Sequence, residues 1–447
     1  MKNARVAILG AGREGQAVWR QLRHRFPGKS LSLFAESDFD AGFLQLLDPA
    51  RDHYHIGAFD ADELASFDIL VRSAGISPYR PELAQLKSQG CRFTSASNLW
   101  FAENPAARTL CISGTKGKST SAALTHHLLT AAGINSCLAG NIGRPMLDCE
   151  GLDVDWWVIE LSSYQISDLE ARPDIVVLLN LSDEHVDWHG SAEQYAADKL
   201  RLVELAGNGQ VFANYSDEAL LKRLGQAPGV TWFNMDGTWQ AEDDRVVGKG
   251  GKQVSAVAAL PGERNMQNLA AVLSVIDQLG LEIDDLDHAL STFNGLPHRL
   301  QLIGEKDGIR CIDDSISTTP VSVAAALQTV GFKDVVLLLG GMDRGLDWSD
   351  FAVQLRDQTP HAVITLPDNG DKISGYLKNA GVDPAGGLHR SAHLEQAVGL
   401  ALKLVPENGC ILLSPGAPSF PHFKDFEDRG NQFNNYLGIE KCTSSAH

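Results

Sequence analysis

The chain has 447 residues, 44% of them hydrophobic and 21% charged, a composition that is typical of globular proteins and excludes the disordered and fibrous classes. Lys and Arg number 38 and Asp and Glu number 56, so the net charge is −18, which argues against a broad nucleic-acid-binding surface. At about 150 residues per domain, the length predicts about three domains.

The cysteines and the apolar runs indicate a cytoplasmic protein. Seven cysteines are scattered along the chain without a C-x-x-C pair, as expected for reduced thiols. No apolar stretch approaches the ~20 residues of a membrane helix, and the run that starts at Val6 is too short for a signal peptide. We therefore expect neither a membrane nor a nucleic acid as a partner.

Short apolar runs alternate with segments of helical spacing, a pattern typical of buried parallel strands joined by helices. The runs are residues 6–9, 69–71, 109–112, 154–159, 175–179, 335–339, 362–366 and 410–413. Helices are predicted over residues 119–132 and about 266–279, and hairpins or a surface insertion over residues 234–257. We predict an α/β protein with three domains, at residues 1–93, 94–298 and 299–447.

A glycine-rich turn follows the first predicted strand. Residues 10–15, Gly-Ala-Gly-Arg-Glu-Gly, open a helix, and Glu36 lies at the end of the next strand. Such glycines let the backbone approach a diphosphate at the helix N-terminus, as in dinucleotide-binding folds. A turn that only packs a helix on a strand has the same pattern, so NAD, another nucleotide and no ligand all stay open.

A second loop lies between the predicted strand 109–112 and the predicted helix 119–132. Residues 114–120 read Gly-Thr-Lys-Gly-Lys-Ser-Thr, a sequence in which backbone N–H groups and Lys118 contact phosphate oxygens and Ser119 or Thr120 reaches Mg²⁺. Ile112 occupies the position of the first glycine of the standard phosphate-binding pattern. In this strand–loop–helix context, a phosphate-binding loop is favoured over a chance match.

Two further strand ends carry candidate metal ligands. Glu160 ends one apolar strand, and Asp183, Glu184 and His185 follow the next. Carboxylates at the C-terminal edge of a parallel sheet, beside a phosphate loop, suit Mg²⁺. A strand-end acid is also typical of a solvated surface, and a single histidine of a surface or core residue, so these alternatives remain at this point.

These motifs, in this order, resemble those of the Mur ligase family, whose members use ATP to form amide bonds in peptidoglycan precursor synthesis. The resemblance spans nearly the whole chain and is strongest to the members that add glutamate to UDP-N-acetylmuramoyl-L-alanine. It rests on residues 10–15, 114–120, 140–143, 160–165, 180–187, 195–200, 262–268, 295–299, 313–315, 340–344, 413–420 and 423–430.

The resemblance implies a Rossmann-like N-terminal domain for UDP, a central P-loop ATPase domain with a parallel sheet, and a Rossmann-like C-terminal domain for ATP and the amino acid. It implies ATP and Mg²⁺ as cofactors, UDP-N-acetylmuramoyl-L-alanine and glutamate as substrates, and a monomer. The implied UDP-sugar contacts are Arg13, Glu14, Glu36, Ser37, Ser73, Gly75, Asn141 and Ser162. The implied ATP contacts are Gly114, Thr115, Lys116, Gly117, Lys118, Ser119, Thr120, Asn268, Arg299 and Asp314. The implied metal ligands are Ser119, Glu160, His185 and Lys199, and the implied amino-acid contacts are Thr318, Arg344, Ser419 and Phe426.

The implied reaction runs through an acyl phosphate. The substrate carboxylate attacks the γ-phosphate while Lys118 and Mg²⁺ neutralise charge, and the amine of glutamate then displaces phosphate. Lys199 falls on the family's carbamylated lysine, and a carbamate is an anion that can bind a metal, whereas an ammonium is repelled. The implied catalytic residues are Lys118, His185 and Lys199, and His185 is a candidate acceptor of the amine proton if it is not only a ligand.

Two departures from the glutamate-adding pattern concern the amino-acid pocket. Ile316 stands where the pattern has one lysine, and Arg344 where it has another. The loss of one cation, and the exchange of a point charge for a planar guanidinium, change how a carboxylate is recognised. These departures favour L-glutamate, with D-glutamate as the alternative. Arg264, where the family usually has histidine, is a further departure.

Two other functions compete with the ligase. An NAD-dependent oxidoreductase rests on residues 10–15 alone and leaves Lys118, Glu160, His185 and Lys199 unexplained. A regulatory protein with a decayed nucleotide site conflicts with the presence of those same four residues.

Overall fold

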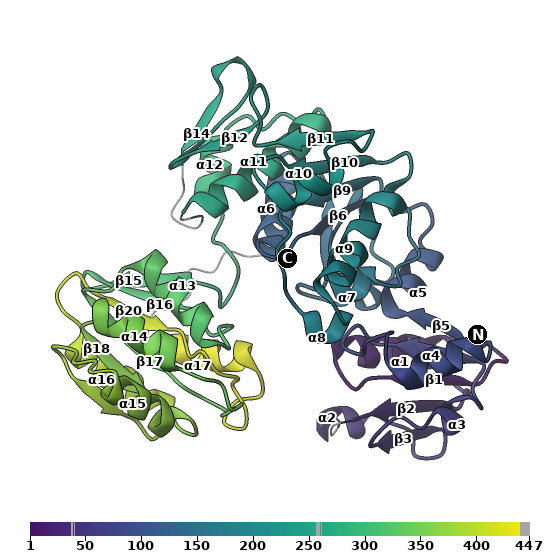
Figure 1. Cartoon of the computed structure of the whole chain (residues 1–447), viewed down its shortest axis with the longest axis horizontal. Coiled ribbons are helices and arrows are strands. Elements are labelled where there is room, and N and C mark those ends of the chain that lie inside the picture. Colours follow the sequence, from purple (N-terminus) through teal and green to yellow (C-terminus); the bar gives the residue numbers. More distant parts are fainter. Residues whose placement is uncertain (37–38, 40, 256–259, 261, 439–447) are drawn as a thin grey trace. The chain divides into compact units, whose positions relative to one another are not determined.

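The computed structural model describes residues 1–36, 39, 41–255, 260 and 262–438 (Figure 1). The contacts between Cα atoms divide the chain into two units. The first unit holds residues 1–255 and 263–290, and the second holds residues 260, 262 and 291–438. Both units contain parallel sheets flanked by helices, which confirms the α/β class. The division into domains at 93/94 and 298/299 stays a prediction.

The N-terminal part of the first unit is a five-stranded parallel sheet of order β3-β2-β1-β4-β5, the order of the first five strands of a Rossmann fold. Its strands are β1 (Val6–Leu9), β2 (Leu31–Ala35), β3 (Asp52–Ile56), β4 (Ile69–Arg72) and β5 (Arg92–Ser95). Its helices are α1 (Arg13–Arg25), α2 (Ala41–Leu44), α3 (Ala61–Leu64), α4 (Pro81–Ser88) and α5 (Ala96–Glu103). The sheet therefore ends two residues beyond position 93.

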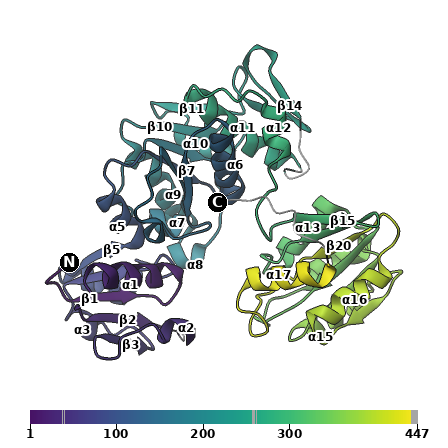
Figure 2. The ribbon, with the colours of Figure 1, turned by 180° about the vertical axis from the view of Figure 1, so that it is seen from behind.

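The rest of the first unit contains a six-stranded parallel sheet of order β11-β10-β9-β6-β8-β7. Its strands are β6 (Thr109–Ser113), β7 (Ser136–Gly140), β8 (Trp156–Glu160), β9 (Ile175–Leu178), β10 (Gln210–Asn214) and β11 (Val230–Phe233). Its helical segments are α6 (Lys118–Ala131), η1 (Met146–Cys149), α7 (Ser163–Ile166), α8 (Val186–His189), α9 (Ala192–Ala206), α10 (Glu218–Leu224), α11 (Glu263–Gln278) and α12 (Leu286–Ser291). Helices α6 and α11 lie side by side (Figures 1 and 2).

The predicted hairpins are confirmed as a small antiparallel sheet that packs on α11. Its strands are β12 (Gln240–Glu242), β13 (Arg245–Val247) and β14 (Gln253–Ser255), with the short helix η2 (Lys249–Gly251) between the last two. The last residues of the predicted stretch, 256 and 257, lie outside the described residues.

The second unit contains a six-stranded sheet of order β15-β16-β20-β17-β18-β19, parallel except for the β15–β16 hairpin. Its strands are β15 (Gln301–Lys306), β16 (Ile309–Asp313), β17 (Val335–Leu339), β18 (Ala362–Thr365), β19 (Leu388–Arg390) and β20 (Cys410–Leu413). Its helices are α13 (Pro320–Val330), α14 (Ser349–Asp357), α15 (Gly370–Asn379), α16 (Leu394–Leu404) and α17 (Phe426–Leu437).

The apolar runs became strands because both faces of each parallel sheet are covered by helices. Every residue of β1, β9, β17 and β20 is buried, so neither face has to be polar. All eight predicted runs coincide with strands to within two residues at each end. No helix among the described residues has the length and apolar character of a membrane span. Six cysteines are free thiols, as predicted, and Cys442 lies outside the described residues.

The strand order brings distant candidate residues to one sheet edge. In the six-stranded sheet of the first unit, β6 pairs with both β8 and β9, and β8 pairs with β7. The carboxyl ends of these strands carry the 114–117 loop, Glu160, Asn180 and Asn141. Ligands bind at this edge in open α/β sheets, so the fold itself assembles a candidate site.

Candidate active site

The phosphate-binding loop has the predicted strand–loop–helix setting, with β6 before it and α6 after it. Gly117 is the residue before α6 and has a φ of 85°, and a Cβ there would lie 2.6 Å from Asn268 Oδ1. Only glycine fits this position without strain. Asn268, an expected ATP contact, is buried and lies against the loop. The ammonium of Lys118 donates to the carbonyls of Gly114 (3.0 Å) and Thr115 (2.9 Å).

The segment after β9 forms hydrogen bonds to this loop. Asn180 accepts from the Lys116 N–H through Oδ1 (2.7 Å) and donates to the Lys116 carbonyl (2.9 Å). The Thr115 hydroxyl accepts from the Ser182 N–H (2.9 Å) and lies 2.8 Å from the Tyr195 hydroxyl. These bonds fix the position of the loop relative to the segment after β9, and none of them could be predicted from the sequence motif.

Glu160 occupies the strand end beside the loop. In the sheet register it stands opposite Ile112 on β6 and Gly140 on β7. Its carboxylate is fully buried: Oε1 accepts from Asn141 Nδ2 (2.7 Å), and Oε2 has no hydrogen-bond partner among the described residues. A buried carboxylate oxygen without a donor is costly unless a cation or a ligand satisfies it.

Lys199 lies in the interior of α9 with 1% of its surface exposed. Its Nζ donates to the Gly114 carbonyl (3.0 Å), which places it directly under the phosphate loop. Burial, together with the positive charge of Lys118, lowers the pKa of Lys199 to about 7. A substantial fraction of this side chain is therefore a neutral amine at neutral pH.

His185 has a left-handed backbone (φ 56°) immediately before α8. Such a conformation in a residue other than glycine stores strain and is frequent at functional sites. Burial lowers the pKa of His185, although Glu184 opposes the shift, which favours the neutral imidazole, the form that binds metals. Glu184 also forms an ion pair with Lys116 of the loop.

The residues around the loop fit Mg²⁺ together with a nucleotide. Among the described residues, no three His, Cys, Asp or Glu side chains gather into a complete metal site. Mg²⁺ is commonly held by one or two protein carboxylates, with substrate phosphates and waters completing its shell. The orphaned Oε2 of Glu160 next to a phosphate loop matches that requirement. Ser119, His185 and Lys199 remain predicted ligands.

A cavity of about 320 Å³ lies at the carboxyl edge of β1 and β4 and reaches the end of β7. The N-terminus of α1 has no side-chain cap, so its N–H groups are available to an anion. The Ser73 hydroxyl is buried without a hydrogen-bond partner in the described part of the chain. Seven of the expected UDP-sugar contacts are residues that the structure describes. Six of these seven line this cavity: Arg13, Glu14, Ser73, Gly75, Asn141 and Ser162.

Glu14 is hydrogen-bonded to two other segments that line this cavity. Its carboxylate accepts from the Ala74 N–H (2.8 Å) and from Gln165 Nε2 (2.7 Å). Glu36 does not line the cavity but forms a bidentate ion pair with Arg80, with N–O distances of 2.8 and 2.7 Å. Ser37, the remaining expected UDP-sugar contact, lies outside the described residues.

In the second unit, Asp314 is buried directly after β16. It accepts from the Ser414 hydroxyl (2.7 Å) and the Leu300 N–H (3.2 Å), and burial raises the pKa of its carboxyl to about 7. Arg299, the other expected ATP contact of this unit, is exposed beside the Leu300 turn.

The expected amino-acid contacts follow three different strands of the second unit. Thr318 lies after β16, Arg344 after β17, and Ser419 and Phe426 after β20. Arg344 is exposed and Ser419 is buried. Ile316 is half-buried, and its N–H donates to the His298 carbonyl (3.1 Å).

Sequence reasoning assigned no role to Arg429, which holds this region together. Its guanidinium is fully buried and donates to the Ser315 hydroxyl (3.0 Å) and to the Ser315 carbonyl (2.8 Å). The Ser315 hydroxyl in turn donates to the Phe426 carbonyl (2.8 Å). Arg429 therefore links the segment after β16 to the start of α17. Its place inside a matched motif was the only available signal.

Comparison with known proteins identifies the family. Residues 112–276 match the Mur ligase middle domain, and residues 298–416 match the Mur ligase, glutamate ligase domain. A protein of Xanthomonas euvesicatoria pv. vesicatoria named UDP-N-acetylmuramoyl-L-alanine--L-glutamate ligase is 42% identical over 99% of this chain and 96% of its own length. Proteins of the same name from Xylella fastidiosa (strain 9a5c) and a Micromonospora species are 38% and 34% identical over 98% and 97% of this chain, each over 96% of its own length.

Solved structures agree in fold. The UDP-N-acetylmuramate-alanine ligase MurC of Thermotoga maritima has a TM-score of 0.59 at 18% identity, covering 98% of this chain and 100% of its own. The MurF ligase of the same organism, in complex with ADP, has a TM-score of 0.58 at 14% identity, covering 98% and 96%.

The site and these matches define an ATP-dependent ligase that forms amide bonds. The chain belongs to the Mur ligase family. The glycine-rich turn at residues 10–15 is thus part of a ligase, and the interpretation as an NAD-dependent oxidoreductase is wrong.

The close contact between Gly117 and Asn268 can be tested with two glycines at opposite ends of α6. We expect Gly117→Ala to weaken ATP binding at least tenfold, because its Cβ would displace the Asn268 carboxamide. Gly133→Ala is the matched control: its φ is 76°, but no atom lies within 4 Å of the added Cβ. Both changes cost ~1–2 kcal/mol of left-handed strain, so calorimetric ATP titration separates binding from stability. Equal ATP affinity in the two variants would contradict the role of this contact.

Proposed function

We propose that this enzyme joins L-glutamate to UDP-N-acetylmuramoyl-L-alanine through an acyl phosphate, in peptidoglycan precursor synthesis. The observation that carries the proposal is that the cavity at α1 reaches the end of β7, in the sheet whose edge carries the phosphate loop. Asn141 lines the cavity at α1 and donates to Glu160, which stands beside the phosphate loop. A sugar nucleotide bound in the cavity therefore has its far end directed toward ATP. The names of the relatives support the same substrates.

The proposed chemistry assigns a role to each side chain at the loop. Lys118 and the loop N–H groups neutralise the γ-phosphate as the substrate carboxylate attacks it. Mg²⁺, held by Ser119, Glu160 and His185, supplies further charge neutralisation on the phosphates when bound. The amine of glutamate then attacks the acyl phosphate and releases phosphate. The buried surroundings of Glu160 and Lys199 limit the access of water to this intermediate.

Lys199 acts in this proposal as a carbamate. Its buried position disfavours the ammonium form, and its neutral amine is the form that reacts with CO₂. The resulting anion lies under the phosphate loop, where it supports the metal and no longer repels it.

The preference for L-glutamate rests on the amino-acid pocket. Ile316 stands where the glutamate-adding pattern has a lysine, so one cation is missing from the pocket. Arg344 stands where the pattern has a second lysine, so a planar guanidinium takes the place of an ammonium. The relatives from Xanthomonas euvesicatoria and Micromonospora are named as ligases that act on UDP-N-acetylmuramoyl-L-alanine and L-glutamate. D-glutamate is the alternative substrate.

We further propose three domains with the predicted bounds, a monomer and a cytoplasmic location.

The function can be tested by phosphate release from ATP. We expect release only when UDP-N-acetylmuramoyl-L-alanine and glutamate are both present, with L-glutamate at least tenfold more active than D-glutamate in kcat/KM. Lys118→Ala should abolish release with both enantiomers, because it removes the cation at the γ-phosphate. No release with either enantiomer would refute the ligase; a preference for D-glutamate would refute only the stereochemistry.

The carbamate predicts a dependence on bicarbonate and pH. Enzyme depleted of CO₂ should lose activity and regain it when bicarbonate is added. With dissolved CO₂ held at one concentration, the rate of recovery should rise as the pH increases through about 7, because only the neutral amine of Lys199 reacts, rather than near 10.5 as for an exposed lysine. Lys199→Arg should be inactive at all bicarbonate concentrations. Lack of a carbamate signal in the ¹³C NMR spectrum of wild-type enzyme labelled with ¹³C-bicarbonate would contradict this role.

The stereochemical assignment predicts the effect of restoring two lysines. Ile316→Lys combined with Arg344→Lys should raise the ratio of kcat/KM for D-glutamate to that for L-glutamate by about tenfold, equivalent to ~1.4 kcal/mol. Arg356→Lys, an exposed arginine on α14 paired with Asp357, is the matched control and should leave the ratio unchanged. An unchanged ratio in the double variant would show that other residues choose the enantiomer.

A further inference from the structure

A hydrogen-bonded chain of four side chains (Ser163, His189, Asp198 and Tyr79), with Gln194 as a further donor, lies beside the segments of the proposed metal site. The His189 ring bonds to Asp198 Oδ2 through Nδ1 (2.6 Å) and to the Ser163 hydroxyl through Nε2 (3.0 Å). Asp198 Oδ1 accepts from the Tyr79 hydroxyl (2.6 Å) and from Gln194 Nε2 (2.9 Å). His189, Asp198 and Ser163 are all buried. Neither the glycine motifs nor the expected reaction uses any of these residues.

The donors and acceptors of these hydrogen bonds can be assigned in one consistent way. Both oxygens of Asp198 act as acceptors, so Nδ1 of His189 carries the proton that is donated to it. Nε2 then accepts from the Ser163 hydroxyl. Every polar atom in this buried chain is thereby satisfied, which fixes the side chains in one arrangement.

Three members, Ser163, His189 and Asp198, lie on segments that carry a proposed metal ligand. Ser163 begins the helix that follows Glu160, and His189 ends the short helix that follows His185. Asp198 directly precedes Lys199 on α9. The chain thus cross-links the three segments that must stay aligned if Glu160, His185 and Lys199 are to share one cation.

Aromatic packing extends the chain to the phosphate loop. The centroid of the His189 ring lies 4.5 Å from that of Trp188 and 5.2 Å from that of Tyr195. The Tyr195 hydroxyl lies 2.8 Å from the Thr115 hydroxyl. A shift of the imidazole would therefore reach the loop as well as the ligands.

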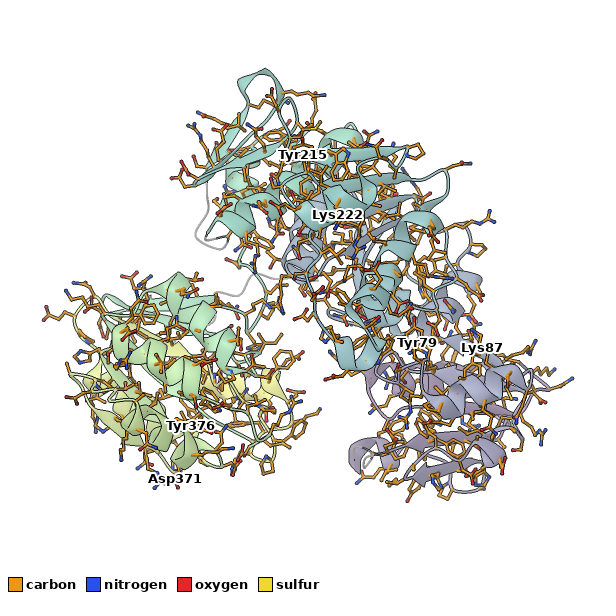
Figure 3. All side chains as sticks on the ribbon, viewed as in Figure 1. Tyr79, Lys87, Tyr215, Lys222, Asp371 and Tyr376 are labelled. Atoms are coloured by element: carbon orange, nitrogen blue, oxygen red, sulfur yellow. The ribbon has the colours of Figure 1, made fainter. Side chains whose placement is uncertain are left out.

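The fourth member comes from the other sheet of the same unit. Tyr79 follows β4, on the segment that includes Ser73 and Gly75 of the proposed UDP-sugar cavity (Figure 3). The same segment is also bonded to Trp188 of α8: the Ser77 hydroxyl donates to the Trp188 carbonyl (2.6 Å), and the Gly75 carbonyl accepts from Trp188 Nε1 (3.0 Å). Of these three bonds, the one from Tyr79 ends on Asp198.

We propose that His189 and Asp198 are positioning residues for the magnesium site, and that Tyr79 links their arrangement to the segment that binds the sugar nucleotide. This inference rests on the proposed metal ligands. It assigns no chemistry to Ser163 or His189, which act through Glu160, His185 and Lys199.

The test is the affinity of the full-length enzyme for Mn²⁺, measured by electron paramagnetic resonance with a non-hydrolysable ATP analogue, with and without UDP-N-acetylmuramoyl-L-alanine. We expect His189→Ala to weaken Mn²⁺ binding at least tenfold under both conditions, the effect typical of residues that orient metal ligands. Tyr79→Phe should weaken it about threefold to fivefold, and only when the sugar nucleotide is present. Ser77→Ala removes the bond to the Trp188 carbonyl and the bond that the Ser77 hydroxyl accepts from the Tyr79 N–H (3.3 Å), but it keeps the Tyr79 hydroxyl that donates to Asp198, and it should leave Mn²⁺ affinity within twofold of wild type.

Controls separate positioning from loss of fold. The dissociation constant of the ATP analogue without metal and the melting temperature are measured for each variant, and Tyr79→Phe should change neither. Equal Mn²⁺ affinity in wild type and both Tyr79→Phe and His189→Ala would overturn the inference alone. Equal losses in Tyr79→Phe and Ser77→Ala would also overturn it, because they would reflect only the packing of the segment. If the wild-type enzyme bound no Mn²⁺, the proposed metal site would fail, and this inference with it.

Discussion

The parallel pairing of β6 with β8 on one side and β9 on the other is the constraint on which the site depends. Because parallel strands end at the same edge, this pairing sets the phosphate loop between Glu160 and Asn180, which lie far apart in the sequence. The β7–β8 pairing then adds Asn141, whose amide joins the carboxylate to the cavity at α1. A shift of register by one residue would turn Glu160 to the opposite face of the sheet.

The net charge of the protein opposes the binding of its proposed substrates. The chain carries a net charge of −18, and every proposed substrate is an anion. Binding therefore depends on a few placed cations and backbone N–H groups that act at short range, where the overall field matters least. Lys118 is one such cation. The buried carboxylate of Glu160 would weaken phosphate binding further unless a cation stood between them, which is the physical argument for Mg²⁺.

Burial also changes what a familiar side chain can do. On an exposed helix face Lys199 would be an ordinary ammonium, but inside the unit its pKa falls to about 7. The same burial makes Asp198 and His189 dependent on one another, since neither has water as an alternative partner, and Asp198 also accepts from Tyr79. Side chains without an expected role in the reaction thus decide how rigidly the proposed ligands are held.

The α/β class, the eight apolar strands and the strand–loop–helix setting of residues 114–120 could be predicted from the sequence, because apolar runs and glycine spacing are local signals. The sequence also marked Ile316 and Arg344 as departures from the glutamate-adding pattern. The folded structure was needed to show that Glu36 pairs with Arg80, that Arg429 links Ser315 to α17, and that His189 bonds to Asp198. Those partners come from segments that sheet register and helix packing bring together, and no local pattern in the chain encodes which distant side chains will meet.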